Sequence, residues 1–172
     1  MDINYICKVA NNEFSKRGRT EKFEELEALV YQKCSYAEIL KYVQTVKGAD
    51  IDQACERIIA YNDAEFAYYF ACDCKKLDKI NTQKLQKAVL DMNDPHYAYE
   101  FARDVKFADI QAIENYIINS GIKSQSTHYI KKFLKIRGCN KAKLLEAIDK
   151  IHDKQLQGVI DELSDTQTPN TL

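Results

Sequence analysis

The chain has 172 residues and a formal net charge of −1, with 45% hydrophobic and 30% charged residues. This near-neutral balance excludes a global field that would recruit nucleic acid or an anionic membrane. Five glycines and two prolines are too few for the turns of a sheet and favour helices. The chain shows neither the roughly 20-residue apolar run of a membrane span nor the pattern of a signal peptide. We therefore expect a cytoplasmic protein.

Two interleaved series of helix-capping residues recur along the chain with a period of about 30 residues. In the first series a basic residue, two mostly small or apolar residues and a capping residue follow one another. It occurs at 47–50, 106–109 and 137–140, and in weaker form at 17–20 and 75–78. The second series begins the other helix of each pair, at Ser35, Asp63, Asp94 and Ser126.

These signals predict a chain of helical pairs. The predicted pairs are 2–14 with 20–33, 36–46 with 50–60, 64–75 with 79–91, 95–106 with 109–119, and 127–136 with 140–151. A closing helix follows at about 153–163, and the polar residues 164–172 are expected to be disordered. Helical spacing places Leu29, Leu145 and Leu156 on inward faces.

A single pair of this length cannot bury its apolar face alone, but stacked pairs form a continuous core. The sequence therefore predicts an all-α fold. We expect an α-solenoid of about five pairs with a C-terminal capping helix, forming one domain over residues 1–163. A sheet is disfavoured because no sustained alternation of period two is present. A coiled coil is disfavoured because capping residues interrupt the pattern about every 12–15 residues.

The stretch Tyr97-Ala-Tyr-Glu-Phe-Ala-Arg-Asp-Val-Lys106, followed by Ala108-Asp-Ile110, resembles a short helical repeat common in bacterial and bacteriophage proteins. The general architecture is similar to HEAT-like repeats. The resemblance covers about 35–150, and the fourth repeat matches it best, whereas 72–74 and 134–136 depart from it. It implies a solenoid with a binding role and carries no catalytic residues.

No motif predicts catalysis. The five glycines are isolated, so no phosphate-binding loop is present. The histidines lack the i, i+4 partner of a helical zinc motif. Cys72 and Cys74 would point about 200° apart on a helix, which disfavours a shared metal, and Cys74 is expected to fill the core where the next repeat has Val105. We expect no enzymatic activity, metal, cofactor or small-molecule substrate.

Tyrosines mark a candidate surface. Tyr68 and Tyr99 stand 31 residues apart, each one residue after a core alanine. Tyr69, Glu100 and Arg103 accompany them, and tyrosine together with arginine is typical of protein-binding hot spots. These five residues are the candidate partner-binding group. The alternative is that the rings pack in the groove between neighbouring helical pairs.

A second candidate is the basic segment 123–154, with nine basic and three acidic residues. Lys131, Lys132 and Lys135 would meet an acidic protein face or nucleic acid phosphates, or form a merely solvated face. We expect a non-enzymatic protein–protein interaction module. More narrowly, we expect a bacteriophage or mobile-element inhibitor of a bacterial defence complex, of the anti-CRISPR kind. The alternative is a nucleic-acid-binding repeat protein that uses 123–154.

Overall fold

The computed structural model describes residues 2–165, with side chains as far as residue 158. Ten helices and no strands occur within this described range, so the predicted all-α class is confirmed. The chain divides into two compact units between Asp109 and Ile110. One continuous domain over residues 1–163 stays a prediction.

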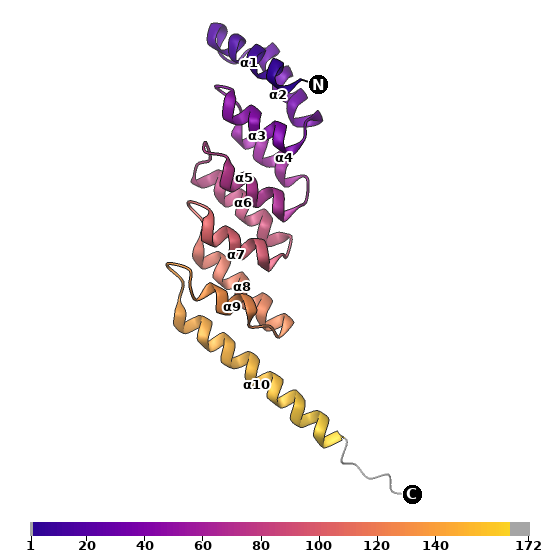
Figure 1. The fold of residues 1–172 in the computed structure, drawn as a ribbon, viewed down its shortest axis with the longest axis vertical. Coiled ribbons are helices and arrows are strands. Elements are labelled where there is room, and N and C mark those ends of the chain that lie inside the picture. Colours follow the sequence, from indigo (N-terminus) through magenta and orange to yellow (C-terminus); the bar gives the residue numbers. More distant parts are fainter. Residues whose placement is uncertain (1, 166–172) are drawn as a thin grey trace, which may run out of the picture. The chain divides into compact units, whose positions relative to one another are not determined.

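The first unit contains seven helices (Figure 1). They are α1 (Ile3–Arg17), α2 (Glu21–Lys33), α3 (Tyr36–Thr45), α4 (Ile51–Ile59), α5 (Ala64–Asp73), α6 (Lys79–Asp91) and α7 (Pro95–Asp104). The second unit contains α8 (Ile110–Ser124), α9 (His128–Phe133) and α10 (Lys141–Asp165). Every helix predicted before residue 137 is present, with its ends shifted by a few residues.

Capping explains most helix starts. The Asp94 carboxylate accepts hydrogen bonds from the backbone N–H groups of His96 at 2.8 Å and Tyr97 at 3.3 Å, and Pro95 occupies the first position of α7. The Asp50 and Asp78 carboxylates cap α4 and α6 in the same way. The predicted capping residues therefore set the boundaries of these helices.

One core aromatic recurs in each of three helices of the first unit. Tyr42, Phe70 and Phe101 are fully buried, in α3, α5 and α7. Their backbone carbonyls accept the N–H groups of the buried capping residues Val46, Cys74 and Val105 at 2.8–3.0 Å. The expectation that Cys74 fills the core position of Val105 is thus confirmed.

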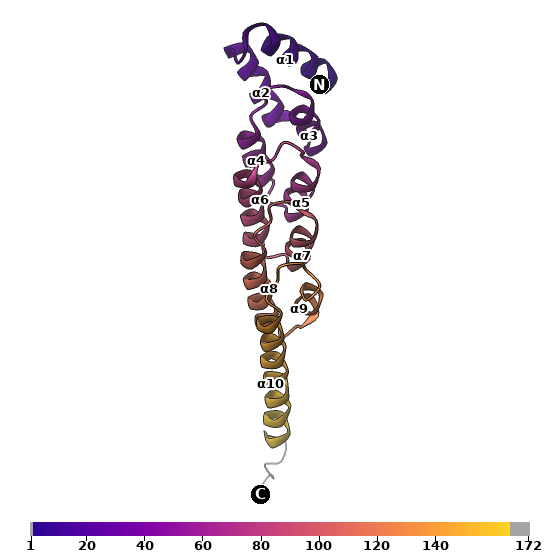
Figure 2. The ribbon, with the colours of Figure 1, turned by 90° about the vertical axis from the view of Figure 1, so that its left-hand side faces the viewer.

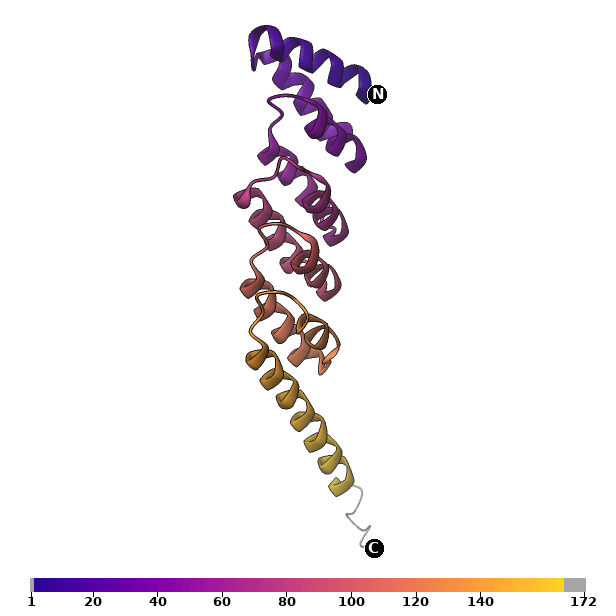
Figure 3. The same ribbon diagram turned by 60° about the vertical axis from the view of Figure 1, so that its left-hand side comes forward.

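The seven helices of the first unit form two layers. Each helix contacts the next one and the next but one along the chain. Figure 2 shows α3, α5 and α7 in one layer and α2, α4 and α6 in the other. The oblique view of Figure 3 shows the same succession of pairs, from indigo to magenta. The turns between paired helices therefore lie along one edge of this unit.

Within the second unit, α9 lies closely against the end of α8. Gly121 of α8 is buried, and a Cβ atom there would lie 2.6 Å from Ile130 Cδ1 and 2.8 Å from the Ser126 carbonyl oxygen. The close approach of backbone requires glycine at this position. Helix α10 contacts both α8 and α9.

Some sequence predictions were wrong. The helices expected at 140–151 and 153–163 form the single helix α10, because no glycine or proline separates them. This helix also includes Ser164 and Asp165, and the rest of the predicted tail lies outside the described residues. Leu29, Leu145 and Leu156 are exposed and do not face inward. In α2 the inward position near Leu29 belongs to Glu27.

Candidate functional site

The turn after α7 has a feature that sets it apart from the matching turn after α3. The two turns run Val46-Lys-Gly-Ala-Asp50 and Val105-Lys-Phe-Ala-Asp109. Their third residues, Gly48 and Phe107, have φ angles of 74° and 67°. This left-handed region favours glycine, whereas a bulky residue there is strained. Phe107 is nevertheless 46% exposed, so only about half of its surface gains from burial.

A buried amide holds the Phe107 turn in place. Gln86 of α6 accepts the backbone N–H of Asp109 through Oε1 at 2.7 Å and donates Nε2–H to the Asp109 carbonyl at 3.3 Å. Gln86 is itself buried. In the matching turn, buried Glu27 accepts the Asp50 N–H at 2.7 Å. The surroundings therefore impose the conformation of Phe107, which is how local strain persists in a folded chain.

A cavity of about 310 Å³ opens beside Phe107 and is called the turn cavity below. Its lining consists of Ala71, Cys72, Cys74, Lys75, Leu77, Thr82, Asp104, Lys106 and Phe107. These residues come mainly from the end of α5, the end of α7 and the turns that follow them. The Lys106 ammonium lies 4.7 Å from the Phe107 ring centroid, which is a cation–π distance.

Tyr68 adjoins this cavity but is a packing residue. It is 8% exposed, and its hydroxyl donates to Asp104 Oδ2 at 2.7 Å. Its ring lies 5.1 Å from that of Tyr69 and 5.8 Å from that of Tyr97. Burial, followed by the hydrogen bond to Asp104, raises the pKa of Tyr68. Tyr68 therefore fills the groove between α5 and α7, as the packing alternative expected.

Arg103 is the centre of the charged part of this surface. Its Nε and Nη2 donate to the two Asp104 carboxylate oxygens at 2.8 and 2.6 Å, and it also pairs with Glu100. These hydrogen bonds from Arg103 come first among the causes that lower the pKa of Asp104. The guanidinium lies 5.7 Å from the Tyr99 ring centroid. Asp104 thus connects Arg103 with Tyr68.

The predicted tyrosine group is therefore brought together in two parts. Tyr99, Glu100 and Arg103 meet on α7, while Tyr68 and Tyr69 meet on α5. Sequence reasoning missed Asp104, which joins the parts, and Phe107. A signal for Phe107 was present in the sequence, because Gly48 and Gly138 occupy its position in two other turns.

The predicted lysines belong to the second unit. Lys131 and Lys135 are exposed, and the Lys132 ammonium lies 5.2 Å from the Tyr129 ring centroid. Elsewhere in the basic segment, Lys143 pairs with buried Glu114 at 3.7 Å, and Lys150 pairs with Glu146 at 2.6 Å. Part of the positive charge of 123–154 is thus already matched within the unit.

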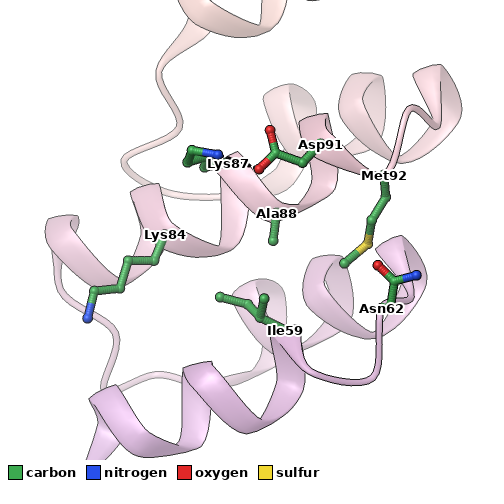
Figure 4. A pocket seen from close by; sticks show the side chains of 7 residues that line it. All are labelled: Ile59, Asn62, Lys84, Lys87, Ala88, Asp91 and Met92. Carbon is green, nitrogen blue, oxygen red and sulfur yellow. Dashed lines mark hydrogen bonds and ion pairs between the residues drawn. The ribbon is translucent and has the colours of Figure 1, made fainter.

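The α4–α6 layer of the first unit carries another cavity, of about 410 Å³ (Figure 4). Its lining residues are Ile59, Asn62, Lys84, Lys87, Ala88, Asp91 and Met92. Ile59 and Ala88 face each other across its floor (Figure 4). Both lysines are already paired, Lys84 with Asp52 at 2.6 Å and Lys87 with Asp91. The cavity therefore offers an apolar floor without a free charge.

The buried thiol groups have little nucleophilic character. Cys7, Cys34, Cys55 and Cys74 are buried, and burial raises the pKa of Cys55 to about 12. No cluster of three or more potential metal-binding side chains occurs among the described residues. Within that same part of the chain, no helix combines the length and apolar character needed to cross a membrane. No family model, curated protein or solved structure matches the chain.

Proposed function

We propose that this chain is a non-enzymatic protein-interaction module, built as an α-solenoid of HEAT-like helical pairs. The recurring turn, the recurring core aromatic and the regular contacts between successive helices of the first unit support this proposal. Repeat arrays of this kind present extended surfaces on which partners bind.

The observation that carries the proposal is the aromatic and arginine cluster on α5 and α7. Tyr69 is 43% exposed, and the Arg103 side chain is 46% exposed. Two carboxylates already hold the Arg103 guanidinium, so less side-chain freedom is lost when a partner binds. Tyrosine and arginine residues dominate the binding energy of many interfaces. Tyr68 acts as the packed base of this surface and not as a contact.

The test begins with affinity purification from the native host and identification of the partner by mass spectrometry. The purified partner is then titrated with the wild type and with the variants Tyr69→Ala and Arg103→Ala. Each substitution is expected to weaken binding about tenfold, or about 1.4 kcal/mol. Tyr69→Ala should leave the thermal unfolding midpoint nearly unchanged, whereas Arg103→Ala also removes the pairing with Asp104 and should lower the free energy of unfolding by less than about 1 kcal/mol.

The matched control is Tyr5→Ala, which removes another exposed tyrosine, on α1. It is expected to bind as tightly as the wild type. Equal affinities for Tyr69→Ala, Arg103→Ala and the control would contradict the assignment of this surface.

The alternative function is nucleic acid binding through 123–154, where Lys131 and Lys135 are exposed. It predicts retention on duplex DNA or RNA that weakens steeply as salt rises. Charge reversal in Lys131→Glu and Lys135→Glu would abolish that retention. Salt-independent behaviour in both variants and the wild type would rule this alternative out.

The narrower proposal, a cytoplasmic bacteriophage inhibitor of a bacterial defence complex, draws its support from the resemblance of 97–110 to repeats of bacterial and bacteriophage proteins. A gene neighbourhood of phage or mobile-element genes is the expected result. A neighbourhood of housekeeping genes would count against it.

A further inference from the structure

We infer that the turn cavity is the docking site for an acidic segment of a protein partner. One apolar side chain of the segment enters the cavity against Phe107, and flanking carboxylates pair with Lys75 and Lys106. This inference rests on the proposed protein-interaction function and specifies the chemistry of the partner.

The conformation of the turn does not require a phenylalanine at position 107. Gly48 and Gly138 adopt the same left-handed conformation at the matching positions of their turns. Phe107 takes on the strain of this conformation while its ring is about half exposed. An exposed aromatic ring beside a cavity is suited to anchor an incoming apolar side chain.

The turn cavity has the size of a small binding pocket. Its volume of about 310 Å³ is at the lower end of ordinary binding pockets and suits a side chain with its adjoining backbone. Ala71, Leu77 and Phe107 supply apolar lining, and Thr82 adds a hydroxyl. The lining is therefore mixed, with apolar surface beside at least as much polar and charged surface, which suits a segment that carries both an apolar and acidic side chains.

The turn cavity also carries positive charge. Lys75 and Lys106 line the turn cavity, and neither has an ion-pair partner within the described part of the chain. The remaining charge, on Asp104, is matched by Arg103 and by the Tyr68 hydroxyl. The cavity therefore presents two unmatched positive charges, which complement carboxylates on a partner.

The α4–α6 cavity provides the contrast. Its lysines already have partners: Lys84 pairs with Asp52, and Lys87 pairs with Asp91, which lines the same cavity (Figure 4). An acidic segment would have to displace those carboxylates in order to bind there. The charge pattern thus selects the turn cavity for an acidic partner.

The experiment uses the full chain and a displayed library of random dodecapeptides as the probe. Selected peptides are expected to carry aspartate or glutamate on both sides of a leucine, isoleucine, methionine or phenylalanine. A synthetic peptide of the consensus sequence is then titrated with each variant. Phe107→Gly, and separately Lys75→Glu, should weaken its binding at least about tenfold.

The controls are Leu29→Ala, which removes another exposed apolar side chain, and Lys33→Glu, which reverses another exposed lysine. Both should bind the peptide like the wild type. Basic consensus sequences, or unchanged binding by Phe107→Gly and Lys75→Glu, would overturn the inference. If the native partner depends on Tyr69 and Arg103 but not on Phe107, the inference fails while the proposed function stands. If no protein partner binds at all, both fail.

Discussion

The turns 46–50 and 105–109 are built alike except at one residue. Both begin with a buried valine, continue with lysine, and end with an aspartate whose N–H donates to a buried side chain 23 residues earlier in the sequence. Their third residues are Gly48 and Phe107. A Cβ atom on Gly48 would lie 2.0 Å from the Phe14 ring, so packing within the fold demands glycine there. Packing within the fold makes no such requirement at Phe107, so its side chain remains available for binding.

A carboxylate in one turn and an amide in the other have the same role, because each accepts the N–H of the aspartate that ends its turn. Glu27 accepts from the Asp50 N–H, from Arg19 at 2.7 Å and from the Tyr31 hydroxyl at 3.3 Å. Gln86 does the equivalent with one neutral amide. The Glu27 carboxylate accepts hydrogen bonds from more groups than the Gln86 amide does, so its removal should destabilise the fold more.

The largest expected effect therefore comes from Glu27→Leu. The substitution leaves the Asp50 N–H without its acceptor and removes the ion pair with Arg19, and should lower the free energy of unfolding by about 3 kcal/mol. Tyr31 keeps the Asp50 carbonyl as acceptor at 2.8 Å, and Arg19 keeps the Gly48 carbonyl at 2.6 Å. Part of the Arg19 contribution is screened because its side chain is 36% exposed. Urea denaturation followed by circular dichroism measures the loss.

Two matched variants sharpen this comparison. Gln86→Leu should cost about 2 kcal/mol, because the Asp109 N–H loses its neutral acceptor and the Asp109 carbonyl loses its donor. Glu25→Leu, at an exposed position of the same helix as Glu27, should change the free energy of unfolding by less than about 0.5 kcal/mol. If Glu27→Leu lowers the free energy of unfolding no more than Glu25→Leu does, the Glu27 carboxylate does not stabilise the turn.

Gly48→Ala should be the next most damaging change. The strained φ angle costs about 1 kcal/mol, and the contact with Phe14 brings the total to about 2 kcal/mol. Thermal and urea unfolding provide the measurement. Gly138→Ala has the same kind of φ angle but nothing within 4 Å of its added Cβ, so about 1 kcal/mol is expected. Equal losses in the two variants would mean that the Phe14 contact has no role.

A smaller effect is expected from the link between Asp104, Arg103 and Tyr68. The hydrogen bonds from Arg103, and then that from Tyr68, hold the pKa of Asp104 below its ordinary value. A carboxyl group whose pKa is lowered by folding stabilises the folded state at pH values above its unfolded pKa of about 3.9. This stabilisation is lost as the pH falls through the folded pKa. Because the carboxylate is 33% exposed, the contribution stays under about 1 kcal/mol.

The check is to measure the unfolding free energies of the wild type and Asp104→Asn between pH 7 and pH 3. The wild type should be more stable at pH 7, and the difference should shrink on acidification. A difference that is constant over this range would exclude the charge of Asp104 as its source.

The helices were predictable because their signals are local. Asp50, Asp78 and Asp94 cap helices through neighbours two or three residues away, and these contacts follow directly from the sequence. The break expected between residues 151 and 153 is absent, because the residues around Asp153 give no local signal that would end a helix.

The errors concern contacts between distant residues. Glu27 is buried and Leu29 is exposed because the Asp50 N–H, 23 residues away, needs an acceptor. Apolar periodicity alone assigns those two positions the other way round. The burial of Tyr68 depends in the same way on Asp104, 36 residues later. The tyrosine pattern alone could not distinguish a packed ring from an exposed one.

The smallest expected change in stability comes from the substitution that matters most to binding. Phe107→Gly releases the strain of the left-handed conformation, while it increases the freedom of the unfolded chain and removes a half-exposed ring. These effects nearly cancel, so the free energy of unfolding should change by no more than about 0.5 kcal/mol in either direction.

The most direct test of the account is therefore the urea unfolding of Phe107→Gly beside that of Gly48→Ala. The account predicts that Phe107→Gly unfolds at the wild-type urea concentration, while Gly48→Ala unfolds at a clearly lower one. A loss of about 2 kcal/mol or more in Phe107→Gly would show that the ring serves the fold, and would contradict its assignment to partner binding.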